Sequence, residues 1–203
     1  MKIETIKNVN ITMLFSAPIN HLLVSQKDLL DLFKTGDQEK NKHAFVEAPG
    51  FKVLIFPNRQ KEIVFEATRI LVNDKTGREP KKTEIVDDLQ TVLKIDGVEQ
   101  DKLVAYGFNY DVVITPGRDN FNINNLVSDK IASMENIKNA GVHLSFEKDN
   151  IVYALDIKPI RIKQKFVAHF NAHFSANKLP AAKILKKGIS AQFEELINIL
   201  KKI

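Results

Sequence analysis

Two histidines, His169 and His173, stand four residues apart towards the end of the chain. On a helix, this spacing would let two imidazoles share one metal ion. Here, however, the flanking residues alternate between apolar and polar, which is typical of a strand, and four residues of strand span about 13 Å. We therefore predict two surface histidines on a strand and no metal site.

The same alternating segment carries a row of basic side chains. A sheet face that presents cations can neutralise the phosphates of a nucleic acid or another polyanion. The phenylalanines of this segment fall on the opposite side, where we expect burial rather than base stacking. Lysines on strands also protect sheet edges from pairing with other chains, so this second interpretation stays open. The residues that we predict to contact a polyanion are Arg161, Lys163, Lys165, His169 and His173.

Charge is distributed unevenly along the 203 residues. The whole chain has a net charge of +5, yet residues 158–203 contain ten basic and only two acidic side chains. The preceding part is therefore net acidic. A basic C-terminal segment on a mildly acidic body can indicate an anionic partner.

The sequence offers little support for catalysis. The carboxylate pairs Asp87-Asp88 and Glu194-Glu195 are expected in the first turns of helices, where they complement the helix dipole. Asp74-Lys75-Thr76-Gly77 is expected to form a turn. There is no glycine-rich phosphate loop and no Gly-x-Ser-x-Gly nucleophile motif. The absence of cysteine excludes disulfides, thiolate zinc sites and cysteine nucleophiles. We predict a protein that is not an enzyme, with no cofactor, no metal and no catalytic residue.

The order of predicted elements in the first half begins with a strand that ends at Ala17-Pro18. A helix follows, with Ser25 and Asp28 at capping-box spacing. Residues 51–56 and 63–72 are predicted to form a hairpin, and a second helix covers residues 85–93.

The second half repeats this order. A strand over residues 103–114 ends at Thr115-Pro116, apolar residues at helical spacing mark a helix over 123–137, and residues 142–146 and 151–157 form a hairpin. The segment 193–200 matches 86–93 class by class. We therefore predict an α+β fold with two pseudo-symmetric strand-helix-strand-strand-helix repeats, residues 1–98 and 99–203. The second repeat has an extra long basic strand, residues 160–175. Together they would form one antiparallel sheet with helices on one face.

This duplicated order resembles the TATA-binding protein family, whose two repeats form one curved, saddle-shaped sheet with helices on the convex side. That family inserts paired phenylalanines into the DNA minor groove. No such pair falls on an exposed face here, so the resemblance implies the architecture and not the DNA-contacting residues. The segment Gly107-Phe108-Asn109-Tyr110 is also similar to a motif in a sporadic family of uncharacterised bacterial proteins, and that resemblance implies no activity.

The N-terminal segment alternates apolar and polar residues, unlike a signal peptide, and no apolar run is long enough to cross a bilayer. We therefore predict a cytoplasmic location and no membrane contact. Our first functional hypothesis is a non-catalytic binding module that contacts nucleic acid or another polyanion through its basic sheet face. The alternatives are a module for protein–protein interaction or self-assembly into a homo-oligomer, and a small-molecule receptor or enzyme with a cleft between the repeats.

Overall fold

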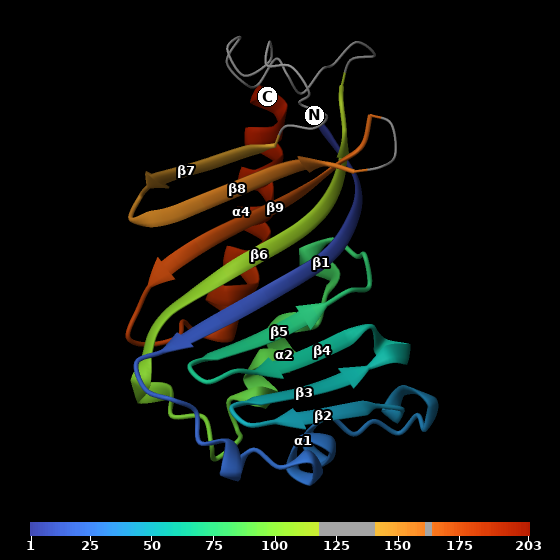
Figure 1. Cartoon of the computed structure of the whole chain (residues 1–203), viewed down its shortest axis with the longest axis vertical. Helices are drawn as coiled ribbons and strands as arrows, with labels where there is room; N and C mark the ends of the chain where they lie inside the picture. Colours follow the sequence, from blue (N-terminus) through green and yellow to red (C-terminus); the bar gives the residue numbers. More distant parts are fainter. Residues whose placement is uncertain (118–140, 161–163) are drawn as a thin grey trace.

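The computed structural model describes residues 1–117, 141–160 and 164–203. These residues form one antiparallel nine-stranded sheet and three α-helices (Figure 1), which confirms the α+β fold class. The strands are β1 (Lys2–Phe15), β2 (Ala44–Ala48), β3 (Phe51–Phe56), β4 (Lys61–Phe65), β5 (Arg69–Asp74), β6 (Leu103–Thr115), β7 (Val142–Lys148), β8 (Ile151–Pro159) and β9 (Phe166–Ser175). The helices are α1 (Gln26–Phe33), α2 (Ile85–Val92) and α4 (Ala182–Lys202). Single 3-10 turns occur at His21–Leu23, Glu39–Asn41, Pro57–Arg59, Pro80–Lys82 and Gln100–Lys102.

The strands lie in the order β2-β3-β4-β5-β1-β6-β9-β8-β7. The two long strands β1 and β6 are therefore central, and they pair over almost their full length. β5 lies beside β1 and β9 lies beside β6. Each half of the chain thus places its first strand at the centre and its last strand next to it.

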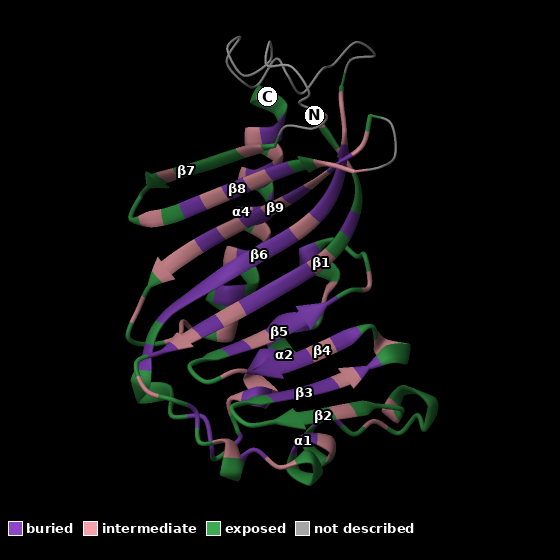
Figure 2. Ribbon diagram, in the orientation of Figure 1, coloured by how far each residue is buried: buried purple, intermediate pink, exposed green. Residues whose placement is uncertain are grey.

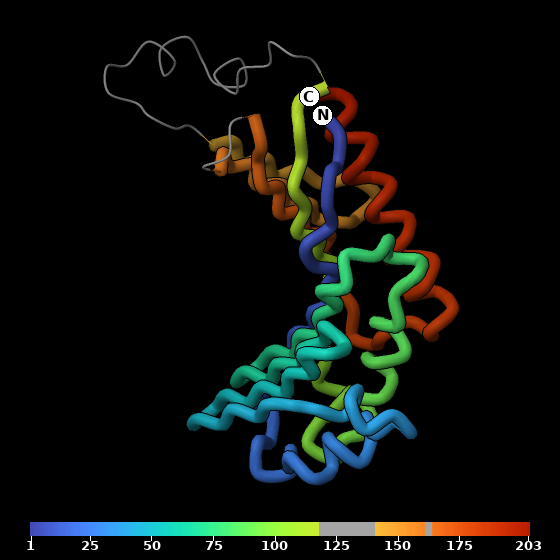
Figure 3. The backbone as a smooth tube through the Cα atoms, turned by 90° about the vertical axis from the view of Figure 1, so that its right-hand side faces the viewer, coloured from blue at the N-terminus to red at the C-terminus, as the bar shows by residue number. Residues whose placement is uncertain are grey.

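The described helices cover one face of this sheet. Phe56, Lys61 and Tyr110 belong to one register row that crosses the strands, so their side chains point to the same side. Helix α1 contacts Phe56 through the ring of Phe33, α2 contacts Lys61 through Asp88, and the Tyr110 hydroxyl donates to the Ile189 carbonyl of α4 at 2.5 Å. Figure 3 shows α4 along one side of the sheet.

The core lies between the sheet and these helices. Aromatic rings fill it near α4, with Tyr110 5.4 Å from Phe193 and 6.2 Å from Phe170 between ring centroids. Gly188 lets α4 approach closely, because a Cβ at this position would lie 3.0 Å from the Phe108 ring. The central strands are mostly buried, whereas the edge strands β2 and β7 are largely exposed (Figure 2).

The first half contains two strands more than predicted. The apolar run over residues 63–72 is interrupted by a turn, in which Glu66 N donates to the Arg69 carbonyl at 2.8 Å, so that β4 and β5 form a second hairpin. The carbonyls of Ala67 and Thr68 accept from Ile19 and Phe15, which fixes this turn against the end of β1. Residues 44–48 also form a strand, β2. The prediction of a single hairpin in this half is therefore wrong.

Two C-terminal boundaries also differ from the prediction. The strand expected over residues 160–175 begins at Phe166, because Ile160 N donates to the Lys165 carbonyl and Gln164 adopts a left-handed φ of 58° where the chain turns. Helix α4 begins at Ala182, well before the segment 193–200, so Glu194 and Glu195 are not in a first helical turn. The helix passes through Gly188 without interruption.

Several local predictions are confirmed. Ser25 caps α1 by accepting from Asp28 N at 3.1 Å, and the residues Asp149 and Asn150 form the turn between β7 and β8 with left-handed φ values of 52° and 61°. The helix predicted over residues 123–137 lies outside the described residues. None of the described helices has the length and apolar character to cross a membrane.

Candidate functional site

Four asparagines on adjacent strands form a continuous row across the centre of the sheet. Register pairing places Asn73 of β5 opposite Asn10 of β1, Asn10 opposite Asn109 of β6, and Asn109 opposite Asn171 of β9. We call these four residues the asparagine row, and the face of the sheet that carries them the amide face. It is the face opposite the described helices, towards the viewer in Figure 1.

The side chains of the asparagine row are linked by hydrogen bonds that run in one direction. Asn171 Nδ2 donates to Asn109 Oδ1 at 2.5 Å, Asn109 Nδ2 to Asn10 Oδ1 at 2.7 Å, and Asn10 Nδ2 to Asn73 Oδ1 at 2.8 Å. Thr12 joins the row, since its hydroxyl donates to Asn10 Oδ1 at 2.6 Å. A chain of amides aligned in this way polarises each member and fixes the orientation of the remaining N–H and C=O groups.

This composition is unusual for the centre of a sheet. Asparagine is depleted from strands, because its amide competes for the backbone and packs poorly on a pleated surface. Yet Asn10, Asn73 and Asn109 are at most 9% exposed. A local preference that is overridden in this way is most often found at a functional or strained site.

Gly107 supports the same arrangement. It lies inside β6, two residues before Asn109 and on the same face, and a Cβ there would be 3.1 Å from the Ala172 carbonyl oxygen and 3.3 Å from Asn171 Nδ2. A glycine within a strand commonly marks a close approach of another group. Here it makes room for the amide at the end of the row.

Carboxylate and imidazole pairs lie beside the asparagine row. His169 Nδ1 is 2.7 Å from Asp111 Oδ1 across β9 and β6, and His143 Nδ1 is 2.8 Å from Asp156 Oδ1 across β7 and β8. The Asp111 carboxylate raises the pKa of His169 above 6.5, and the hydrogen bond from His169 lowers the pKa of Asp111 below 3.8. Asn8 connects the His169–Asp111 pair to the row, since its Nδ2 donates to both Asp111 and Asn73.

Among the residues that the sequence predicts for polyanion contact, Lys165, His169 and His173 can be located. Lys165, directly before β9, forms an ion pair with Glu4. His169 and His173 lie on β9 on the amide face, with His173 opposite Gly107 and His169 bound to Asp111. Arg161 and Lys163 lie outside the described residues. The structure therefore brings the two histidines to one face, and it places carboxylates beside Lys165 and His169.

The sequence pattern missed the asparagine row and the two aspartates beside the histidines. Asn8, Asn10 and Asn109 do stand at polar positions of alternating segments, which is the available signal. These side chains come into contact only because their strands are neighbours in the sheet. The spacing of residues along the chain does not determine the order of the strands.

Comparison with protein-family models and with curated proteins gave no match. The chemical properties of the amide face must therefore be judged from its own geometry.

Proposed function

We propose that this chain is a non-catalytic binding module that holds nucleic acid on its amide face. The observation that carries this proposal is the asparagine row, which sets amide donors and acceptors across four strands. Neighbouring strands lie about 4.8 Å apart, so the row extends over about 14 Å. Asparagine amides are suited to the donor and acceptor groups at the edges of bases.

The cations of the amide face have the smaller part in this proposal. Lys165 and His169 have carboxylate partners, which offset their attraction for phosphates. His173 has no hydrogen-bond or ion-pair partner among the described residues, and Arg161 and Lys163 are close to Lys165 in sequence. We propose that these cations position the nucleic acid through phosphate contacts, whereas the amides make the contacts nearer its bases.

The predicted duplication belongs to the same proposal. We propose that residues 1–98 and 99–203 are two repeats whose sheets are joined by β1 and β6, with a saddle-like arrangement and a cytoplasmic location. The positions of the four asparagines support it, since Asn10 and Asn109 face each other on the two central strands while Asn73 and Asn171 occupy the two flanking strands.

Fluorescence anisotropy of labelled single-stranded and duplex oligonucleotides tests this function in the intact chain. Asn171→Ala removes the free end of the row, and we expect the dissociation constant to rise about tenfold, equivalent to about 1.4 kcal/mol. Ser145→Ala, in the same register row but on the edge strand β7, is the matched control and should bind as the wild type does.

The charge contribution is measured with a triple variant, Arg161→Glu, Lys163→Glu and Lys165→Glu. It should weaken binding and flatten the dependence on salt, since each lost phosphate contact reduces the salt slope by about one unit. The control reverses Lys183, Lys187 and Lys201 on α4. Absence of oligonucleotide binding at low salt, or equal loss in both triple variants, would overturn the proposal.

A further inference from the structure

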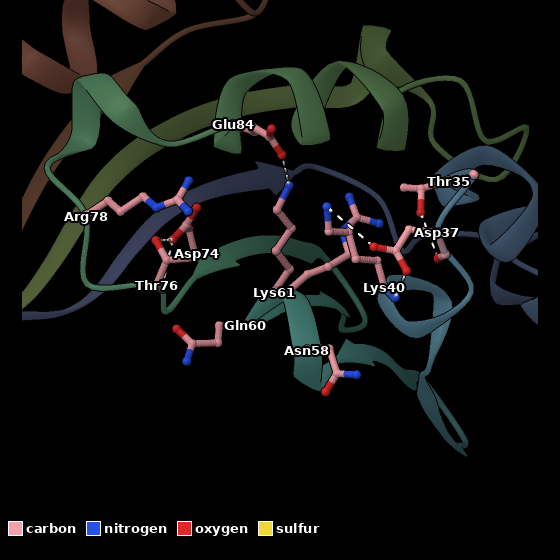
Figure 4. A pocket seen from close by; sticks show the side chains of 12 residues that line it. Thr35, Asp37, Lys40, Asn58, Gln60, Lys61, Asp74, Thr76, Arg78 and Glu84 are labelled. Atoms are coloured by element: carbon pink, nitrogen blue, oxygen red, sulfur yellow. Dashed lines mark hydrogen bonds and ion pairs between the residues drawn. The ribbon is translucent and has the colours of Figure 1, made fainter.

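A polar pocket of about 610 Å³ opens on the helix-covered side of the sheet, at the ends of β4 and β5 (Figure 4). Small-molecule sites in proteins commonly have volumes of about 300–1,000 Å³. Its lining comes from residues 35–40, 58–61 and 74–84, so the pocket lies within the first half of the chain and on the face opposite the asparagine row.

Hydrogen bonds hold the three lining segments together. Asn41 closes the first loop, since its side chain accepts from Thr35 N at 2.8 Å and donates to the Thr35 carbonyl at 2.7 Å. Asn58 Nδ2 donates to the Glu39 carbonyl at 2.9 Å, and Lys75 N donates to the Gln60 carbonyl at 2.8 Å. The walls of the pocket are therefore formed in advance of any ligand.

A charged network around the buried Lys61 lies at the floor of the pocket, with the exposed Glu84 as its outer member. Lys61 Nζ lies 2.7 Å from a carboxylate oxygen of Glu84 and 2.7 Å from one of Asp88. The side chains of Lys61 and Asp88 are only 8% and 9% exposed. Burial raises the pKa of Asp88 even though Lys61 is beside it. Asp88 in the first turn of α2 therefore has two roles. It complements the helix dipole, and it forms an ion pair with Lys61.

Arg59 is fixed above this floor by apolar and polar contacts. Its guanidinium lies 4.9 Å from the centroid of the Phe56 ring, and its Nη1 donates to the Phe33 carbonyl at 2.9 Å. The Asp88 carboxylate is 3.9 Å from Nη2, beyond hydrogen-bond distance. A guanidinium has five N–H donors, so several donors of Arg59 are left over in a fixed orientation.

Arg78 is the second arginine of the pocket. It reaches from the loop after β5 towards Lys61, above Asp74 and Thr76 (Figure 4). It is exposed, and it has no ion-pair or hydrogen-bond partner among the described residues. The neighbouring carboxylates are already engaged, since Asp74 accepts from Thr76 N and Glu84 accepts from Lys61.

We propose that this pocket binds a small polar molecule through an oxyanion, a phosphate or a carboxylate, held by Arg59 and Arg78. A guanidinium matches the oxygens of either anion with two parallel hydrogen bonds. The pocket is larger than one such group, and Thr35, Asn58 and Gln60 supply polar contacts for the rest of the ligand.

Isothermal titration calorimetry of the intact chain with inorganic phosphate, pyrophosphate and malonate tests this site. We expect saturable binding of one anion per chain, and the tighter probe identifies phosphate or carboxylate as the preferred group. Arg78→Gln should raise the dissociation constant about tenfold, which corresponds to the loss of one charge-assisted contact. Because Arg78 is exposed, this variant should fold as the wild type does.

Arg69→Gln is the matched control, since Arg69 is an arginine of the same half of the chain that pairs with Glu66 outside the pocket. It should bind the anions as the wild type does. Three results would overturn the proposal: no saturable binding of any probe, unchanged binding by Arg78→Gln, or equal weakening by Arg69→Gln.

Discussion

The two faces of β6 and β9 are built from alternate residues of the same strands, yet their chemistry is opposite. Towards the helices, β6 presents Phe108 and Tyr110, and β9 presents Phe170, all of them almost completely buried. On the amide face, the intervening positions include Asn109 and Asn171, which contact each other by hydrogen bonds. One face is stabilised by apolar area removed from water and the other by a polar network.

This difference concerns how much each face contributes to stability. Burial of an aromatic side chain contributes several kcal/mol, whereas a hydrogen bond between amides contributes a net of about 1 kcal/mol, since water competes for both groups. The amide face therefore adds less to the free energy of unfolding. In the proposed function, the row would act through its partly exposed end at Asn171, because Asn10, Asn73 and Asn109 are buried. Substitutions on the two faces should separate stability from this proposed binding.

The largest effect is expected on the helix-covered face. Phe170→Ala should lower the free energy of unfolding by about 3–5 kcal/mol, because Phe170 is fully buried between the rings of Tyr110 and Tyr153. Urea denaturation measures this loss. Val152→Ala on the amide face is the control, since Val152 is 44% exposed and should cost little. Equal losses in the two variants would contradict the difference between the faces.

A smaller effect is expected within the asparagine row. Asn109→Ala removes the acceptor of Asn171 and one of the two donors to Asn10 Oδ1, which keeps its bonds with Thr12 and Asn73. We expect the free energy of unfolding to fall by about 1–3 kcal/mol in urea denaturation. A loss as large as that of Phe170→Ala would mean that the amide face is a main source of stability, which would weaken its assignment to binding.

The smallest effect concerns pH and the ion pair of His169 with Asp111. The raised pKa of His169 gives stability that is present below about 6.5 and is lost as pH rises through that raised value. The lowered pKa of Asp111 gives stability that is present above about 3.8 and is lost as pH falls through that lowered value.

His169→Gln should therefore destabilise the chain most between these limits, by no more than about 1 kcal/mol, because both side chains are partly exposed. Thermal unfolding of the variant and the wild type over a pH series measures the difference. His173→Gln is the control, since His173 has no ion-pair partner among the described residues. A difference that is independent of pH would contradict the role of the ion pair.

The fold class and many elements follow from local patterns in the sequence. Alternation identified β6 and most of β9, the hairpin of β7 and β8 was predicted, and the Ser25 cap was predicted from its spacing to Asp28. The split of residues 63–72 into two strands was missed, because the turn at Glu66 is stabilised by the distant residues Phe15 and Ile19. The start of α4 was missed because only the segment 193–200, which matches residues 86–93, was recognised as helical.

The candidate site was less predictable than the fold. The two histidines were placed on one strand correctly and Lys165 was not, since β9 begins one residue after it. The carboxylate partners, Glu4 of Lys165 and Asp111 of His169, lie far away in sequence. The asparagine row forms only because four particular strands are neighbours in the sheet, and the sequence pattern does not give their order. The pocket with Arg59 and Arg78 depends on three loops that only the folded chain brings together.

The asparagine row joins residues that are far apart in the sequence and that therefore leave the ribosome at different times. Asn10 pairs with Asn109, 99 residues later, and the last amide arrives only with β9. Pairings of this range close slowly, because the entropy of the intervening chain must be lost first. A chain that has docked β1 on β6 but not yet β9 therefore has an incomplete row. A partner that needed all four amides would therefore bind only chains in which β9 is already paired with β6.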